Sequence, residues 1–240
     1  MGTVEAVRPT PRDKIAGMKA YTVLRAPAPL TLARGWDDAA WAAAAPLEIA
    51  EFRPESSDHR PRTQARLAYD DAGLFGIFRV EDRYVRCVHR QFQDPVYQDS
   101  CVEVFLQPKP DRGYVNLEMS CGGALLASHV TDERRTPEGF AAFRKLTPEE
   151  GRQVLVRSSL PPVVDPEIDA PVDWELAFFL PTAVLEGCVG PIGPLAGQEW
   201  RANLYKCGDK TSHPHWAAWS PVDALNFHLP RCFGTLRFEA

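Results

Sequence analysis

The chain has 240 residues and a hydrophobic content of 45%, which is enough to bury a sizeable core in one domain or two small ones. Its 27 basic and 32 acidic residues give a net charge of -5. This balance argues against a surface for nucleic acid or for an anionic membrane, so we expect a small, neutral ligand.

The cysteines are scattered, at positions 87, 101, 121, 188, 207 and 232. They lack the close pairs of a zinc ribbon or of a disulfide-rich secreted domain, so we expect mostly buried thiols. No signal-peptide core and no apolar run of about 18 residues occurs in the sequence. As the sequence stands, a cytoplasmic location is expected, and secretion only if a leader was removed.

In chain order, residues 1–19 carry prolines and charges without periodicity, which predicts a flexible lead-in before a single domain over residues 20–240. The alanine-rich stretch 39–44 predicts a short helix, with Asp37 or Asp38 as its cap and Pro46 after it. A second helix is predicted over 181–187, which begins with proline and ends with glycine.

From residue 63 onward the hydrophobic period is two, which is typical of strands. Strands are predicted at 63–69, 74–82, 100–107, 114–121, 153–158, 173–180, 200–206 and 233–238. Because so little helix separates them, a parallel α/β sheet is disfavoured. The pattern predicts an all-β fold, an antiparallel β-sandwich of the jelly-roll type.

Alternation also predicts which side chains share a face, because successive strand residues point to opposite sides of a sheet. In 100–107 the apolar face carries Val102, Val104 and Leu106. If the strand is regular back to position 97, the other face carries Tyr97, Asp99, Cys101, Glu103 and Phe105. The same argument places Asn116 and Glu118, and then Arg201, Asn203 and Tyr205, away from the core. A solvated sheet face is the simplest explanation of this pattern.

The segment "KCGDKTSHPHWAAW" opens a stretch, 206–231, with no convincing strand or helix. Loops of this length in compact domains are usually functional or disordered, and the aromatic content argues against disorder. Cys207, His213 and His215 are potential metal ligands, although their spacing is not one of the usual zinc patterns. The two histidines are alternatively expected to shape the loop or to bond a ligand hydroxyl.

Four stretches carry a resemblance to a known family: "WDDAAW", "LAYDDAGLFGIFRVED", "YQDSCVEVFLQP" and "WRANLYKCGDKTSHPHWAAWSPVDALNFHLPRCFGTLRF". Together they resemble family 9 carbohydrate-binding modules and their stand-alone relatives, over residues 20–239. The resemblance implies a jelly-roll or immunoglobulin-like sandwich that holds a sugar between two aromatic rings without catalysing a reaction. It implies a carbohydrate ligand and no cofactor, and it leaves the oligomeric state open.

By position in the family pattern, Tyr97 resembles the first aromatic ring and Trp216 or Trp219 the second. Glu103, Asn116 and Glu118 fall where polar sugar contacts are expected. The resulting hypothesis is a shallow polar cleft with Tyr97 and one tryptophan as walls and Glu103 in the floor. The full set of candidate ligand-binding residues is Tyr97, Asp99, Glu103, Asn116, Glu118, Arg201, His213, His215, Trp216 and Trp219. Xylanase-attached members of the family bind structural calcium, but a complete oxygen-ligand set for it is not matched here.

Two other functions stay open. Glu103 and Glu118, on neighbouring strands, are candidates for the carboxylate pair of a glycoside-processing enzyme, for which a carboxyl separation of about 5 to 9 Å across a cleft is expected. A haem-binding or redox module of related fold would need an axial His or Met facing a deep apolar pocket.

Overall fold

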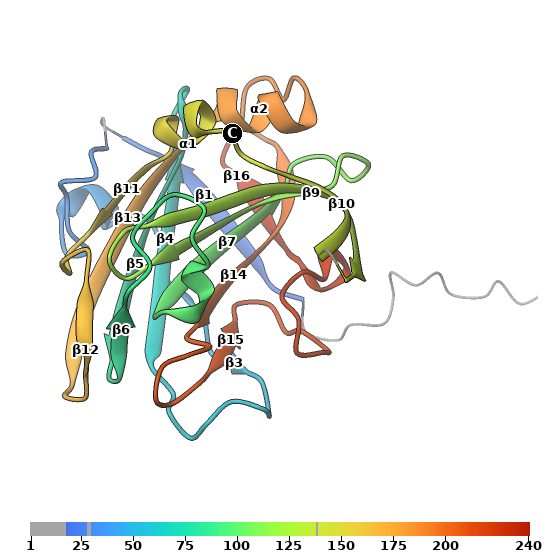
Figure 1. Cartoon of the computed structure of the whole chain (residues 1–240). Coiled ribbons are helices and arrows are strands. Elements are labelled where there is room, and N and C mark those ends of the chain that lie inside the picture. Colours follow the sequence, from blue (N-terminus) through green and yellow to red (C-terminus); the bar gives the residue numbers. More distant parts are fainter. Residues whose placement is uncertain (1–17, 28–29, 138) are drawn as a thin grey trace, which may run out of the picture.

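A computed structural model describes residues 18–27, 30–137 and 139–240. Residues 1–17 of the predicted lead-in lie outside this part of the chain. The described residues form a two-layer β-sandwich, with the two α-helices, α1 (Pro148–Gln153) and α2 (Thr182–Val189), at one end (Figure 1). Neither helix is long and apolar enough to cross a bilayer. The predicted all-β sandwich is thus confirmed.

Hydrogen bonds connect the main strands in one continuous path that folds over the core. The first layer has the order β10 (Gly139–Lys145), β9 (Leu125–Thr136), β8 (Tyr114–Ser120), β7 (Cys101–Gln107), β14 (Glu199–Cys207) and β16 (Gly234–Phe238). The path continues through β1 (Ala20–Arg25) into β4 (Arg62–Tyr69), β5 (Gly73–Asp82), β13 (Val172–Pro181) and β11 (Leu155–Ser158). β1 is parallel to both β16 and β4, and the other pairings of described strands are antiparallel.

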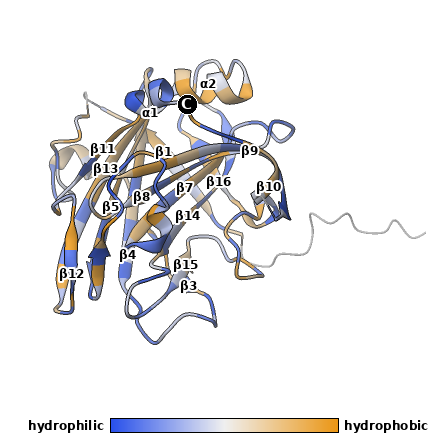
Figure 2. Cartoon of the chain, in the orientation of Figure 1, coloured by the Kyte–Doolittle hydropathy of each residue, from blue (hydrophilic) through white to orange (hydrophobic). Residues whose placement is uncertain are grey.

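Short strands complete the fold at the end opposite the helices. β15 (Trp216–Ala218) pairs with β14 and with β3 (Glu51–Phe52), while β2 (Leu47–Glu48) pairs with β4. β6 (Val85–Cys87) and β12 (Val164–Ile168) make a separate small sheet, whose strands carry both hydrophilic and hydrophobic residues in Figure 2.

All eight predicted strands and both predicted helical segments are present, with small differences at their ends. The first helical segment is a single 3-10 turn, Ala39–Trp41, capped by Asp38, whose carboxylate accepts from the Ala40 N–H at 2.9 Å. The prediction that 206–231 lacks regular structure was wrong, because β15 and a 3-10 turn at Pro230–Cys232 lie within it.

The core forms where the predicted apolar faces meet. Val102, Val104 and Leu106 of β7 are fully buried together with Leu117 and Leu204 of the neighbouring strands. The opposite face of this layer is not the solvated surface that alternation alone suggested. Its aromatic residues form a second apolar cluster with residues of the segment that follows β15; the cluster contains Phe105, Tyr114, Tyr205, Leu229 and Phe233.

One charged residue of β14 points into the core. Lys206 is in phase with Trp200, Ala202 and Leu204 and has no exposed surface. Its Nζ lies 3.4 Å from an Asp82 oxygen, 2.7 Å from His215 Nε2 and 3.1 Å from the Cys207 carbonyl. Three acceptors therefore satisfy the three N–H donors of this buried cation, as burial of a charge requires.

Asp82 is the centre of this buried cluster. Besides Lys206, its carboxylate accepts from Trp174 Nε1 at 3.1 Å and contacts His59 Nε2 at 2.8 Å. Burial by itself disfavours the carboxylate, but the charge of Lys206 and the His59 contact outweigh it and hold the pKa of Asp82 well below its usual range. The cluster ties β5, β13, β14 and the segment before β15 to one another.

Replacing Lys206 by methionine should lower the free energy of unfolding by about 3–5 kcal/mol, because it leaves a buried carboxylate without its cation. The double variant Asp82→Asn/Lys206→Met should lose clearly less than the two single variants summed. Urea unfolding of the four proteins measures this coupling. Additive losses would show that the contact between these two groups contributes nothing specific.

Candidate ligand-binding cleft

A cleft of about 450 Å³ opens on the outer face of β7, β8 and β14. Strand register brings its polar floor together: Glu103 of β7 lies opposite Glu118 of β8 and opposite Tyr205 of β14, and Asn116 lies two residues from Glu118. The β9–β10 hairpin and the segment after β15 supply the sides. The lining comprises Tyr97, Glu103, Asn116, Glu118, Leu126, Ser128, Arg135, Phe140, Phe143, Lys145, Cys207, Asp209, Trp216, Leu225, Asn226, Phe227 and His228.

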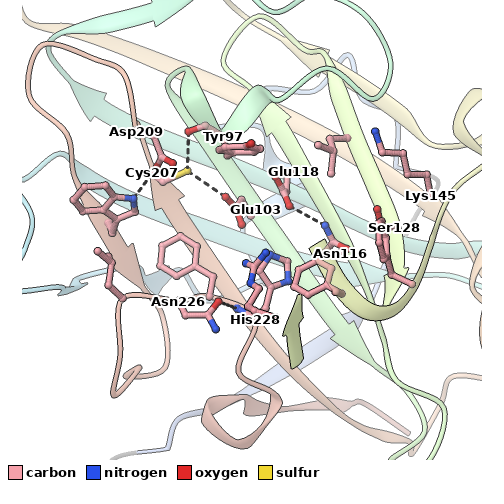
Figure 3. A pocket seen from close by; sticks show the side chains of 17 residues that line it. Tyr97, Glu103, Asn116, Glu118, Ser128, Lys145, Cys207, Asp209, Asn226 and His228 are labelled. Carbon is pink, nitrogen blue, oxygen red and sulfur yellow. Dashed lines mark hydrogen bonds between the residues drawn. The ribbon is translucent and has the colours of Figure 1, made fainter. Parts of the chain in front are cut away.

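Five of the ten candidate residues line this cleft: Tyr97, Glu103, Asn116, Glu118 and Trp216. Figure 3 shows the two carboxyl groups near the centre, with Tyr97 on one side and Asn226 and His228 on the opposite side. The cleft lining brings Tyr97 and Trp216 around a floor that contains Glu103, and their contact with a ligand stays a prediction.

The two aromatic residues are held by local structure. Tyr97 lies in a 3-10 turn, Val96–Gln98. It is accessible to solvent, with 38% of its surface exposed. Trp216 begins β15 opposite Cys207, and its indole Nε1 donates to Asp209 Oδ1 at 2.7 Å. The ring is only partly buried, so part of it remains available to a ligand.

The floor carboxyl groups lie in a strongly desolvated place. Glu103 and Glu118 are 3% and 5% exposed. Burial raises the pKa of Glu118 to about 7, and burial together with Cys207 and Glu118 raises the pKa of Glu103 well above its usual range. Near neutral pH Glu103 therefore holds its proton and Glu118 is partly protonated, so the pair offers both hydrogen-bond donors and acceptors.

Neighbouring polar groups satisfy only part of this floor. The Cys207 thiol donates to Glu103 Oε1 at 3.1 Å, and Asn116 Nδ2 donates to Glu118 Oε1 at 2.8 Å. The Asn116 carbonyl oxygen Oδ1 is buried and has no hydrogen-bond partner among the described residues. Since buried polar atoms are normally paired, this oxygen lacks a donor that a water or ligand would provide.

Asp99 is placed differently from the prediction. It is fully buried, where it contacts Arg86 at 2.9 Å and accepts from the backbone N–H groups of Val88 and His89. The alternation argument assumed a regular strand back to Tyr97. The 3-10 turn interrupts that strand, so Asp99 leaves the face that carries Glu103 and binds the adjacent loop instead.

The other four candidates also lie outside the cleft lining. Arg201 donates to the backbone carbonyls of Phe233 and Gly234. His213 stacks on Tyr84 at a centroid distance of 3.6 Å, and His215 belongs to the Lys206 cluster. Trp219 is a core residue with 3% exposure, because its backbone N–H pairs with Leu204 and its ring packs inward.

The sequence argument missed the hairpin side of the cleft, which contributes Leu126, Ser128, Arg135, Phe140, Phe143 and Lys145. The first half of β9, "LLASHV", is buried except for Leu126, so it shows no regular two-residue alternation. Its second half reads "TDERRT" in the sequence, and that charged run hides the strand.

One group of potential metal ligands comes together among the described residues. The predicted ligands Cys207, His213 and His215 do not come together as a set. A different group does, since the ligand atoms of Cys101, Glu103 and Cys207 all lie within 4.8 Å of one another. Thiols are not calcium ligands, so this group does not fit the structural calcium that the resemblance suggested.

The sequence profile of carbohydrate-binding family 9 matches residues 39–238, which is most of the chain. This chain belongs to carbohydrate-binding family 9. The family consists of non-catalytic binding modules. No curated protein matches the sequence.

Solved structures agree with membership of family 9. A candidate carbohydrate-binding protein from Bacteroides uniformis is 26% identical, with a TM-score of 0.80 over 92% of this chain and 100% of that one. A family 9 module from Caldicellulosiruptor kristjanssonii in complex with glucose is 14% identical, with a TM-score of 0.58 over 92% and 96%. The same organism's module in complex with cellotriose is 15% identical, with a TM-score of 0.56 over 92% and 94%. The last two show a shared fold.

The two candidate tryptophans should differ sharply in stability effects. Trp219→Ala should cost about 3–5 kcal/mol of unfolding free energy, because it leaves a large cavity in the core. Trp216→Ala removes a half-buried ring and should cost about 1–2 kcal/mol. Denaturant unfolding measures both values. Equal losses would mean that Trp216 is as much a core residue as Trp219.

The pH dependence of stability should reveal the buried histidines. Burial, with the nearby cations Lys206 and Arg135 respectively, lowers the pKa of His215 and His228 to about 3. Between about pH 6.5 and 3 the unfolded chain therefore binds protons that the native state does not, so each histidine lowers stability by about 1.4 kcal/mol per unit as pH falls.

Glu103 and Glu118 titrate in the opposite sense, because their raised pKa values let the native state bind more protons above about pH 4.5. The comparison must therefore be made between variants. The stability of His215→Gln relative to the wild type should rise by about 1.4 kcal/mol per unit as pH falls from 6 to 4.5. If the stability of His215→Gln and of the wild type changed equally with pH, His215 would not be neutral in the native state.

Proposed function

We propose that this chain binds a mono- or short oligosaccharide in the cleft, without transforming it. The observation that carries the proposal is the combination of the partly open rings of Tyr97 and Trp216 with a desolvated acid–amide floor. A pyranose has C–H faces that pack on aromatic rings and a rim of hydroxyls that both donate and accept hydrogen bonds. Membership of family 9, and the glucose and cellotriose complexes of the C. kristjanssonii module, support the same function.

The floor provides both partners that a hydroxyl needs. Asn116 Oδ1, which is unpaired among the residues described, is available to accept a hydrogen bond from a sugar hydroxyl. A protonated Glu118 is available to donate a hydrogen bond to a hydroxyl oxygen. Lys145 and Arg135 line the same cleft and supply further donors. Hydrogen bonds that involve a charged partner are stronger than neutral ones. Lys145 and Arg135 therefore favour one orientation of the bound sugar and also strengthen its binding.

The volume agrees with a small saccharide. Pockets for small ligands typically enclose about 300–1,000 Å³, and this cleft has about 450 Å³. The hairpin and the segment after β15 close two sides of the floor, so the ligand is expected to enter between them.

Calorimetric titration with glucose, cellobiose, cellotriose and a panel of other hexoses and xylo-oligosaccharides tests the proposal. Trp216→Ala, Tyr97→Ala and Asn116→Ala should each weaken binding of the sugar that binds by about 1–3 kcal/mol, or roughly 5- to 150-fold. Tyr84→Ala is a matched control, because Tyr84 is a half-buried tyrosine that does not line the cleft.

The control should leave sugar affinity unchanged. Affinity that is insensitive to all three cleft variants would place the sugar elsewhere. No binding by any sugar of the panel would remove the proposal.

One observation keeps a glycoside-processing enzyme as the second candidate. Glu103 and Glu118 are direct cross-strand partners, and such pairs have Cβ atoms about 4.5–5.5 Å apart, close to the carboxyl separation of retaining enzymes. Against it, the two carboxyls lie side by side in one floor, whereas catalytic pairs flank the scissile bond. Chromatography of each sugar after incubation distinguishes the two, since cleavage that Glu103→Gln abolishes would favour the enzyme.

An absorption spectrum of the purified protein addresses the haem alternative. His228 is the histidine of the cleft lining, and its Nδ1 already contacts the Tyr114 hydroxyl at 2.8 Å. A Soret band that His228→Gln removes would favour that alternative over sugar binding.

A further inference from the structure

Two cysteines and a carboxylate converge at one side of the cleft floor. Cys101 and Glu103 are two residues apart on β7, so their side chains leave the same face. Cys207, the last residue of β14, lies directly opposite Cys101 across the antiparallel pair. The strand register therefore brings Cys101, Glu103 and Cys207 together. Their potential ligand atoms, two sulfurs and a carboxylate oxygen, all lie within 4.8 Å of one another.

Cys207 lies close to both other members of this group. The Cys207 thiol donates to Glu103 Oε1 at 3.1 Å, and the Cys101 and Cys207 sulfur atoms lie within 4.8 Å of each other. Cys101 has 0%, Cys207 1% and Glu103 3% of its surface exposed. The group is therefore preorganised and largely shielded from water, but Cys207 and Glu103 still reach the cleft.

No cation of the described residues accompanies the buried Glu103 carboxyl, so only a bound ion would give this group a positive partner. Within the described part of the chain, neither Glu103 nor either thiol takes part in an ion pair. The groups that act most strongly on Glu103 are acidic, namely Cys207, Glu118 and Asp209. Lys206, the nearest cation along the strand, points to the opposite face of the sheet and is engaged by Asp82.

We propose that Cys101, Glu103 and Cys207 bind one thiophilic divalent cation of the zinc class, with its fourth coordination position open to the cleft. Zinc takes thiolate and carboxylate ligands in tetrahedral geometry, and two thiols disfavour the oxygen-preferring calcium and magnesium. Three protein ligands and one open position are the pattern of zinc sites that bind an exchangeable water or ligand atom.

Binding exchanges protons for the metal. The two thiols and the Glu103 carboxyl each release a proton to water when they coordinate, and the bound cation then offsets two of the three negative charges. Apparent zinc affinity should consequently rise with pH.

The experiment uses full-length protein reduced with a non-thiol reductant, cleared of metal by chelation, and checked for its six free thiols. Titration with Co²⁺ should give thiolate-to-metal charge-transfer absorption and the intense visible bands of a tetrahedral site. Titration calorimetry with Zn²⁺ should give one site per chain, and Zn²⁺ should displace Co²⁺. The absence of charge-transfer absorption in the wild type would overturn the proposal.

Variants assign the ligands. Cys101→Ser and Cys207→Ser should each lose part of the charge-transfer band, and Glu103→Gln should keep the band but weaken binding. Each loss of affinity should at least match the roughly 10–100-fold cost of removing an outer-shell partner. Cys87→Ser is the matched control, because Cys87 and Cys121 form a second buried pair of neighbouring thiols without an adjoining glutamate.

If a variant fails to fold, alkylation of the wild type in mild denaturant with and without Zn²⁺ replaces it. Zinc should protect Cys101 and Cys207 more than Cys87 and Cys121. Equal protection of both pairs, or bands that survive both serine variants, would overturn the assignment. None of these measurements needs a sugar, so their failure is distinct from a failure of the proposed carbohydrate binding.

Discussion

The register of β7 between β8 and β14 is the constraint on which both the core and the cleft depend. It places Glu103 beside Glu118 on one neighbour and beside Tyr205 on the other, while Val104 faces the core between them. A slip of one residue would turn the carboxyl into the core and the valine into the cleft. Such a slip would remove Val102, Val104 and Leu106 from the core and turn Glu103 into it, so the same energetic penalty that protects the core also positions the polar floor.

Alternation in the sequence was sufficient to predict the sandwich, the apolar faces and the floor residues Glu103, Asn116 and Glu118, because a period of two assigns every strand residue to a face. It failed for Asp99, where a 3-10 turn breaks the period just before the strand. It also could not predict what covers a face. The hairpin residue Lys145 reaches the cleft through packing between distant elements, and no local pattern encodes that.

The two faces of the β7–β14 pair carry opposite solutions to the burial of ionisable groups. On the core face, Lys206 is enclosed by Asp82, His215 and a carbonyl, so every donor is satisfied and the arrangement leaves no room for another partner. On the cleft face, Glu103 has a thiol as its partner and acidic neighbours. A satisfied cluster rigidifies the strand, whereas an unsatisfied one retains the capacity to bind something. The first therefore holds in place the backbone from which the second acts.

The pairing of β1 with β16 has a consequence for biosynthesis. Ala20 lies opposite Thr235, and Val23 lies opposite Phe238, so the strand that joins the two layers needs a partner that is translated more than 200 residues later. Neither layer can close around the core while the last strand is still inside the ribosome. Chain elongation at about 5–20 residues per second separates the synthesis of β5 from that of β16 by at least about eight seconds. Nascent chains of this protein should accordingly depend on chaperones until β16 has emerged, more than a fold closed by local hairpins would.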